Sequence, residues 1–206
     1  TANGYSGNGT WRDWFKPDID HNEYWFHFDL AINKCRLGFS LAHVVGETKI
    51  ELDLFKIKEK FGVDFDENDL SEEDRFETKP IIKVDAVGWV SNQVEEHNIR
   101  LLMNGDYYYS AIRDNIIFRL QQMGFNIAGV SFDQFQSVDF RQILDNRGIF
   151  TDLISLDRTD EIPVSAKYAL IEQRVEYPFC QLLFDEAKHL KYVAGKKVDH
   201  ARKQSK

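Results

Sequence analysis

The order of helix-like and strand-like patterns in the second half of the chain limits the fold more than any other feature of the sequence. Residues 107–124 carry apolar side chains at helical spacing up to a glycine, and the apolar run 125–133 that follows has the length of a strand. Residues 137–148 and 149–156 then repeat the order of helix and strand. Because strands that are joined through helices pair in parallel, this order predicts an α/β fold.

The first half of the chain contains three further strand patterns, at residues 24–32, 37–45 and 80–90. The first two are separated by a short turn, which predicts that they pair as antiparallel neighbours. Three antiparallel strands followed by alternating helices and strands predict a mixed five-stranded sheet with helices on its faces. Two more helices are expected at residues 164–176 and 179–193.

The size and composition of the chain predict one globular domain. With 206 residues, of which 43% are hydrophobic, the chain can bury a full core. Residues 1–22 are rich in Gly, Asn and Asp and are expected to form a linker or arm before a domain at 23–206. The sequence has neither a long apolar run nor a basic and apolar leader, so we expect a cytosolic protein without a membrane partner. Its two cysteines, Cys35 and Cys180, lie far apart, which fits a reducing compartment.

The net charge of −8 conceals an uneven distribution of charged residues. Acidic residues gather at residues 46–79, which we interpret as a solvated insertion, either a loop or a hairpin. The end of the chain is basic instead. There, Lys196, Lys197, Arg202 and Lys203 are candidates for contact with DNA phosphates, and an ordinary soluble terminus is the alternative.

Two carboxylates stand near the ends of apolar runs that are predicted to be central strands. Asp29 and Asp133 are more than a hundred residues apart in the sequence. If their strands are neighbours, the repulsion between the two charges has to be relieved, and Mg²⁺ or Mn²⁺ suits such oxygen ligands. Two such ions promote phosphodiester hydrolysis by activating water and stabilising the leaving oxygen. The alternative is that both are ordinary aspartates in turns or salt bridges.

Other familiar catalytic patterns are missing from the sequence. It contains no glycine-rich phosphate loop of the Walker type, no G-x-S-x-G elbow and no H-E-x-x-H helix. His27, His43 and His200 are isolated from one another in the sequence, so each is interpreted as a packed or surface residue. The pair of aspartates is therefore the leading candidate for a catalytic site.

Several segments, in their order along the chain, resemble the nuclease domain of the large terminase subunit of tailed double-stranded DNA bacteriophages. They are "HFDLAINKCRLGFSLAHV", "PIIKVDAVGWV", "FNIAGVSFDQFQSVDFRQILDNRGI", "ISLDR", "KYALIEQRVEYP" and "KKVDHARKQSK". The resemblance covers the chain from about residue 24 to its end. It implies a fold similar to ribonuclease H and to Holliday-junction resolvases.

The resemblance also implies a reaction and its partners. In this family the domain cuts concatemeric viral double-stranded DNA at the start and end of genome packaging, with two Mg²⁺ or Mn²⁺ ions. Asp29 and Asp133 match the first and second metal-binding acids. The expected partners are double-stranded DNA, the terminase ATPase domain, the small terminase subunit and the portal protein. The expected location is the host cell cytoplasm, transiently at the portal of the procapsid.

The sequence departs from the family pattern in two places. Relatives often carry a further acid where this chain has Cys35, and their third core acid follows a Ser-Lys pair, which here is Ser205 and Lys206 at the end. We therefore expect the third ligand beyond Lys206, with Asp199 as the alternative, and weak cleavage by the chain as it stands. The ATPase half of a terminase is absent from the sequence.

Further residues are auxiliary candidates. Asp85, Asp157, Asp199 and His200 are candidates for auxiliary or indirect roles at the metal site, with turns or salt bridges as the alternative. Ser137, with the neighbouring Gln136, is a candidate for steadying a loop or a phosphate.

Two other functions stay open at the level of sequence. The missing third acid and Cys35 allow a catalytically silent ribonuclease H-like module that binds DNA or the portal. A Holliday-junction resolvase-like nuclease is the other alternative, and it would form a dimer and prefer branched DNA.

Overall fold

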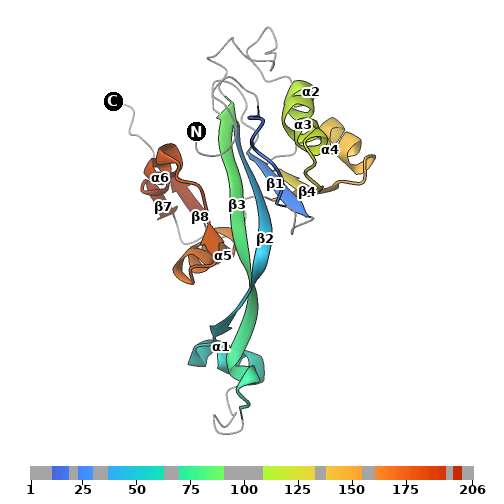
Figure 1. Ribbon diagram of the computed structural model, residues 1–206. Coiled ribbons are helices and arrows are strands. Elements are labelled where there is room, and N and C mark those ends of the chain that lie inside the picture. Colours follow the sequence, from blue (N-terminus) through green and yellow to red (C-terminus); the bar gives the residue numbers. More distant parts are fainter. Residues whose placement is uncertain are drawn as a thin grey trace, which may run out of the picture.

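The computed structural model describes residues 11–18, 23–29, 37–62, 70–90, 109–132, 138–154, 161–193 and 197–200 (Figure 1). Within these ranges the strands are β1 (Tyr24–Asp29), β2 (Leu37–Glu51), β3 (Phe76–Val90), β4 (Ile127–Phe132), β5 (Phe150–Leu153), β6 (Val175–Glu176), β7 (Leu190–Val193) and β8 (Lys197–His200). The helices are α1 (Leu54–Phe61), α2 (Tyr109–Ile112), α3 (Arg119–Gln122), α4 (Val138–Asp145), α5 (Glu161–Ile171) and α6 (Gln181–Ala187), with a 3-10 turn η2 (Glu73–Arg75) and a π-helical segment η3 (Arg113–Phe118).

The main sheet of the described chain is mixed and has the strand order β5-β4-β1-β2-β3-β6. Strands β1, β2 and β3 pair as antiparallel neighbours, whereas β4 is parallel to β1, β5 to β4 and β6 to β3. The predicted α/β class and mixed sheet are therefore confirmed. The predicted number of five strands is wrong, because β6 adds a sixth.

Strand β6 lies in the segment where the sequence predicted the last turns of a helix at 164–176. Helix α5 instead ends at Ile171, and Gln173 adopts a left-handed backbone conformation with φ of 55°. The buried side chain of Arg174 then donates hydrogen bonds to the Glu172 carboxylate at 2.7 Å and to the Pro80 carbonyl oxygen at 2.8 Å. These contacts tie the chain to β3, so tertiary pairing overrides the local helical pattern.

Helices α2, η3 and α3 follow one another without a break and form the helix predicted at 107–124. The helix ends at Gln122, and the turn after it closes at Gly124, whose φ is 99°, where the Phe125 N–H donates to the Leu120 carbonyl oxygen at 3.1 Å. Helix α4 ends at Asp145, and the turn after it closes in the same way at Gly148, with φ of 77°. Only glycine adopts this conformation without strain, and in both places the chain turns directly into a strand.

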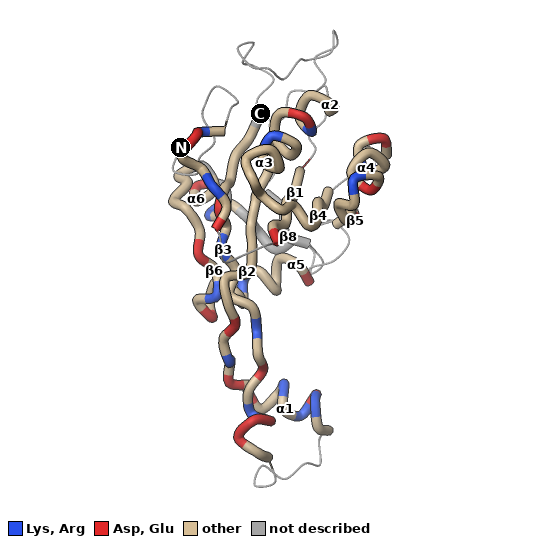
Figure 2. Tube along the Cα trace, turned by 45° about the vertical axis from the view of Figure 1, so that its right-hand side comes forward, with Lys and Arg blue, Asp and Glu red and all other residues tan. Residues whose placement is uncertain are grey.

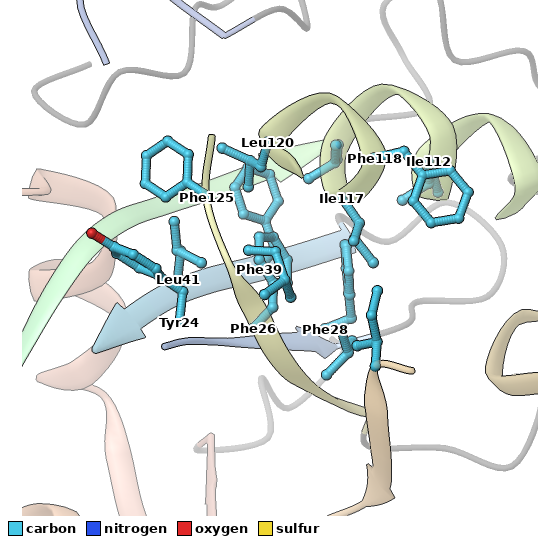
Figure 3. Packing of buried hydrophobic residues seen from close by; sticks show 14 of the residues in the cluster. Tyr24, Phe26, Phe28, Phe39, Leu41, Ile112, Ile117, Phe118, Leu120 and Phe125 are labelled. Carbon is cyan, nitrogen blue, oxygen red and sulfur yellow. The ribbon is translucent and has the colours of Figure 1, made fainter. Parts of the chain in front are cut away.

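One face of the sheet carries an aromatic core beneath the helix that α2, η3 and α3 form (Figure 3). Tyr24, Phe26 and Phe28 alternate along β1 and point toward that helix, together with Phe39 and Leu41 of β2. Helix α4 covers the same face through Phe140 and Leu144. This packing leaves the outward-facing residues of β1 on the opposite face.

Residues 11–18 belong to the segment 1–22 that the sequence predicted as a linker or arm, and they pack on this core. Trp11 and Phe15 are only 6% and 7% exposed, and their rings stack at 5.1 Å. The Trp11 indole also lies edge-on to Phe39 at 6.0 Å. Apolar side chains in a polar segment therefore contribute to the core.

Strands β2 and β3 continue beyond the sheet as a two-stranded ribbon that has α1 near its far end (Figure 1). The acidic stretch 46–79 forms this outer part, so the strands run farther than the predicted 37–45 and 80–90. Acidic and basic residues both occur along the ribbon (Figure 2). Of the two interpretations of this stretch, a loop or a hairpin, the paired strands agree with the hairpin.

The last predicted helix, at 179–193, is wrong in its second half. Helix α6 ends at Ala187, and β7 pairs with β8 as a separate antiparallel hairpin. Leu190 lies opposite His200 in this hairpin, and Val193 lies opposite Lys197.

Candidate active site

Asp29 is the last residue of β1 and lies on the face of the sheet opposite the aromatic core. Along this strand Tyr24, Phe26 and Phe28 are buried, whereas Asp29 is exposed. Successive side chains of a strand point to opposite faces. The alternation that buries Phe28 therefore directs the Asp29 carboxylate away from the core.

Strands β1 and β4 are parallel neighbours, and their register bears directly on the predicted pair of acids. Phe28 lies beside Phe132 in this register. The residue after Phe28 is Asp29, and the residue after Phe132 is Asp133. Parallel strands end at the same edge of a sheet, as the prediction of a shared metal site requires. Asp133 itself lies outside the described residues.

Three phenylalanine rings hold the ends of these two strands in place. Phe28 and Phe132 stack with ring centroids 6.0 Å apart and planes 10° from parallel. Phe140 of α4 lies edge-on to both, at 6.0 Å from Phe28 and 5.2 Å from Phe132. All three are buried, so the backbone that leads to Asp29 starts from a close-packed and rigid base.

His27 shares the face of Asp29, two residues earlier on β1. Its Nδ1 lies 2.9 Å from the Ser131 hydroxyl of β4, its register partner. The sequence interpretation treated His27 as an isolated packed or surface residue. The alternation of β1 alone could have shown that it lies on the same face as Asp29.

Asp85, an auxiliary candidate from the sequence, lies elsewhere on the sheet. Its carboxylate is hydrogen-bonded to Nδ1 of the buried His43 at 2.6 Å, and the Tyr24 ring lies 4.8 Å from the imidazole. Burial raises the pKa of Asp85, although the hydrogen bond with His43 opposes this shift.

The position of Asp85 results from a bulge in β3. Leu41 pairs with Ala86 and Ala42 pairs with Val84, so Asp85 is an extra residue between two register partners of β2. Such a bulge turns a side chain out of the regular alternation. Trp89 is level with Asp29 in the register, and Asp85 lies four residues before Trp89 on β3. Asp85 is therefore not part of the proposed metal site.

The other candidates are only partly covered by the structure. Lys197, Asp199 and His200 lie in β8, where they pair with Val193, Lys191 and Leu190, and the placement of their side chains is not described. The candidates that lie outside the described residues are Asp133, Gln136, Ser137, Asp157, Lys196, Arg202 and Lys203, together with Cys35.

Within the described ranges, no three His, Cys, Asp or Glu side chains lie together as a group that could hold a metal ion. Asp29 belongs to these ranges and Asp133 does not, so the predicted site with Mg²⁺ or Mn²⁺ stays a prediction. Carboxylate oxygens are nevertheless the hard ligands that these ions prefer.

Comparisons with known proteins add no relative: the chain matches no protein-family model, no curated protein and no solved structure. In the part of the chain that the structure describes, no helix is long and apolar enough to cross a membrane.

Proposed function

We propose that this chain is a metal-dependent endonuclease domain that cuts double-stranded DNA, as in the packaging terminases that its sequence resembles. One observation carries the proposal. The parallel register sets Phe28 beside Phe132, so that Asp29 and Asp133 are the next residues of two neighbouring strands that end at the same edge.

The sheet supports the finer proposal of a ribonuclease H-like fold. Three antiparallel strands, β1 to β3, are followed by the parallel strands β4 and β5, as the resemblance implies. In this view β6 and the outer half of the ribbon are additions to the common sheet.

Asp29 and Asp133 are the residues that would hold Mg²⁺ or Mn²⁺. When bound, the ions supply Lewis acidity at the scissile phosphate and lower the pKa of bound water. The protein would contribute the Asp29 carboxylate, which faces away from the core, and the charge of Asp133, each directly after one of two stacked phenylalanines. By the same resemblance, the domain acts in the host cytoplasm at the procapsid portal, together with an ATPase domain and the small terminase subunit.

The test is nicking of supercoiled plasmid with Mn²⁺ or Mg²⁺, with EDTA as the control. It is run on this chain and on a chain that continues past Lys206, where the resemblance expects a third acid. We expect Asp29→Asn and Asp133→Asn to abolish cleavage with an unchanged circular dichroism spectrum, because each substitution removes charge and keeps volume. Asp114→Asn is the matched control, since Asp114 is an exposed carboxylate paired with Arg113 at 2.9 Å on η3.

Three outcomes would overturn the proposal. Cleavage at the wild-type rate by either variant would remove the two acids from the mechanism. If neither chain cuts in either metal, the chain is better described as a silent module that binds DNA or the portal. Preferential cutting of four-way junctions by a dimer would instead identify a resolvase-like nuclease.

A further inference from the structure

Three residues lie side by side across β1, β2 and β3 at the level of the candidate carboxylate. Asp29 is the register partner of Gly38, and Gly38 is the register partner of Trp89. Directly opposed residues of antiparallel strands project to the same face of a sheet. Asp29 and Trp89 therefore face the same side, with a residue that has no side chain between them.

Gly38 differs from its glycine neighbours in what surrounds it. A Cβ atom at Gly88 or at Gly129 would lie 2.3 Å from a ring, that of Phe39 or of Trp25, so close packing requires glycine there. At Gly38, the described residues place only the Asp29 Cβ within 4 Å, at an ordinary contact distance of 3.8 Å.

Backbone conformation does not require glycine at this position either. The glycines with positive φ in the described chain are Gly62, Gly124 and Gly148. Gly38 lies in regular antiparallel pairing within β2. Among the described residues, the missing side chain therefore leaves the surface beside Asp29 low, as glycine does where another backbone approaches closely.

Trp89 forms the far side of this low surface. Neighbouring strands are about 4.8 Å apart, so two strand spacings put Trp89 about 10 Å from Asp29. The Trp89 side chain is partly buried, which restricts the orientation of its ring. An indole held in this way suits packing against a deoxyribose, because the bases of a duplex are already stacked on one another.

We propose that Gly38 and Trp89 form a subsite for the DNA strand next to the scissile phosphate. Gly38 lets the sugar–phosphate backbone lie against β2, and Trp89 packs against a deoxyribose beyond it. Successive nucleotides of one DNA strand are about 3.4 Å apart along the helix axis, so a side chain about 10 Å from the scissile phosphate reaches the first three nucleotides beside that phosphate. This inference rests on the proposed function, because it takes Asp29 as the cleavage site.

The first test blocks the surface at Gly38. Gly38→Leu should weaken binding of a fluorescein-labelled duplex at least ~10-fold, because the leucine side chain would occupy the space beside Asp29. Gly46→Leu is the matched control, since Gly46 lies on the same strand and the described residues place no atom within 4 Å of its Cβ position. Binding is measured in EDTA, so this arm reports on the subsite whether or not the chain cuts DNA.

The second test removes the aromatic ring. Loss of one aromatic packing contact of about 1 kcal/mol is roughly a 5-fold change in affinity. Trp89→Ala should raise the dissociation constant in EDTA, and KM for nicking in Mn²⁺, by about this factor, while kcat changes less. Trp89→Phe should restore most of the affinity. Trp14→Ala, which removes a 61% exposed indole in the N-terminal segment, should change neither constant.

The outcomes separate this inference from the proposed function. If Gly38→Leu and Trp89→Ala bind and cut like the wild type while Asp29→Asn is inactive, the subsite is overturned and the nuclease proposal stands. If both variants bind DNA weakly at unchanged melting temperature while the wild type fails to cut, the DNA surface is supported and the nuclease proposal fails.

Discussion

Replacement of Trp11 tests how firmly the N-terminal segment belongs to the domain. The indole is 6% exposed, stacks on Phe15 and lies edge-on to Phe39. Its Nε1–H donates to the Ile116 carbonyl oxygen at 3.3 Å. Truncation of a buried Trp to Ala typically costs about 3–5 kcal/mol, because the cavity closes only in part.

This cost converts into a measurable shift in melting temperature. For a domain of this size each kcal/mol lowers the melting temperature by about 2–4 °C, so Trp11→Ala should lower it by about 6–20 °C. Trp11→Phe should cost less, because an aromatic ring stays in place. The Ile116 carbonyl still accepts from the Arg119 N–H, so loss of the indole hydrogen bond itself contributes only about 1 kcal/mol.

Thermal unfolding followed by circular dichroism measures these shifts, with urea unfolding as an independent measure. Trp14→Ala is the matched control, because the Trp14 ring is 61% exposed and surface substitutions usually change stability by less than about 0.5 kcal/mol. If Trp11→Ala melts at the same temperature as Trp14→Ala, residues 11–18 do not dock on the core and the reasoning fails.

Three further predictions concern the sheet. Gly88→Ala should lower the free energy of unfolding in urea by about 1–3 kcal/mol, because the new methyl group meets the buried Phe39 ring; an unchanged value would contradict this packing. Gly129→Ala should cost less in the same assay, since the Trp25 ring that it meets is 48% exposed and can move outward; an equal or larger loss would show that this ring is fixed. Burial raises the pKa of Asp85 in the folded protein above its ordinary 3.8. Ionising this carboxyl therefore costs more free energy in the folded protein than in the unfolded chain, so the folded protein loses stability as the pH rises from about 3.8 through the folded-state pKa. Asp85→Asn should therefore gain stability relative to the wild type as urea unfolding is repeated from about pH 4 to neutral pH, and a constant difference would contradict the raised pKa.

The sequence predicted those elements whose patterns are local. Apolar runs located all of β1, β4 and β5 and the inner parts of β2 and β3, and Gly124 and Gly148 correctly marked the turns that end two helices. The short β6 was missed, and the polar outer part of the ribbon was covered only by the alternative of a loop or a hairpin. Their residues become strands through hydrogen bonds to distant partners, not through an apolar pattern of their own.

The same distinction between local sequence pattern and strand pairing applies to the residues of the candidate site. Sequence alone determined that Asp29 lies near the end of an apolar strand, and the alternation of side chains along that strand directs it away from Phe28. It could not determine that β4 lies beside β1, that Gly38 and Trp89 are level with Asp29, or that Asp85 turns toward His43. Those relations depend on register between strands far apart in the chain, and register is decided only when the whole sheet pairs and packs.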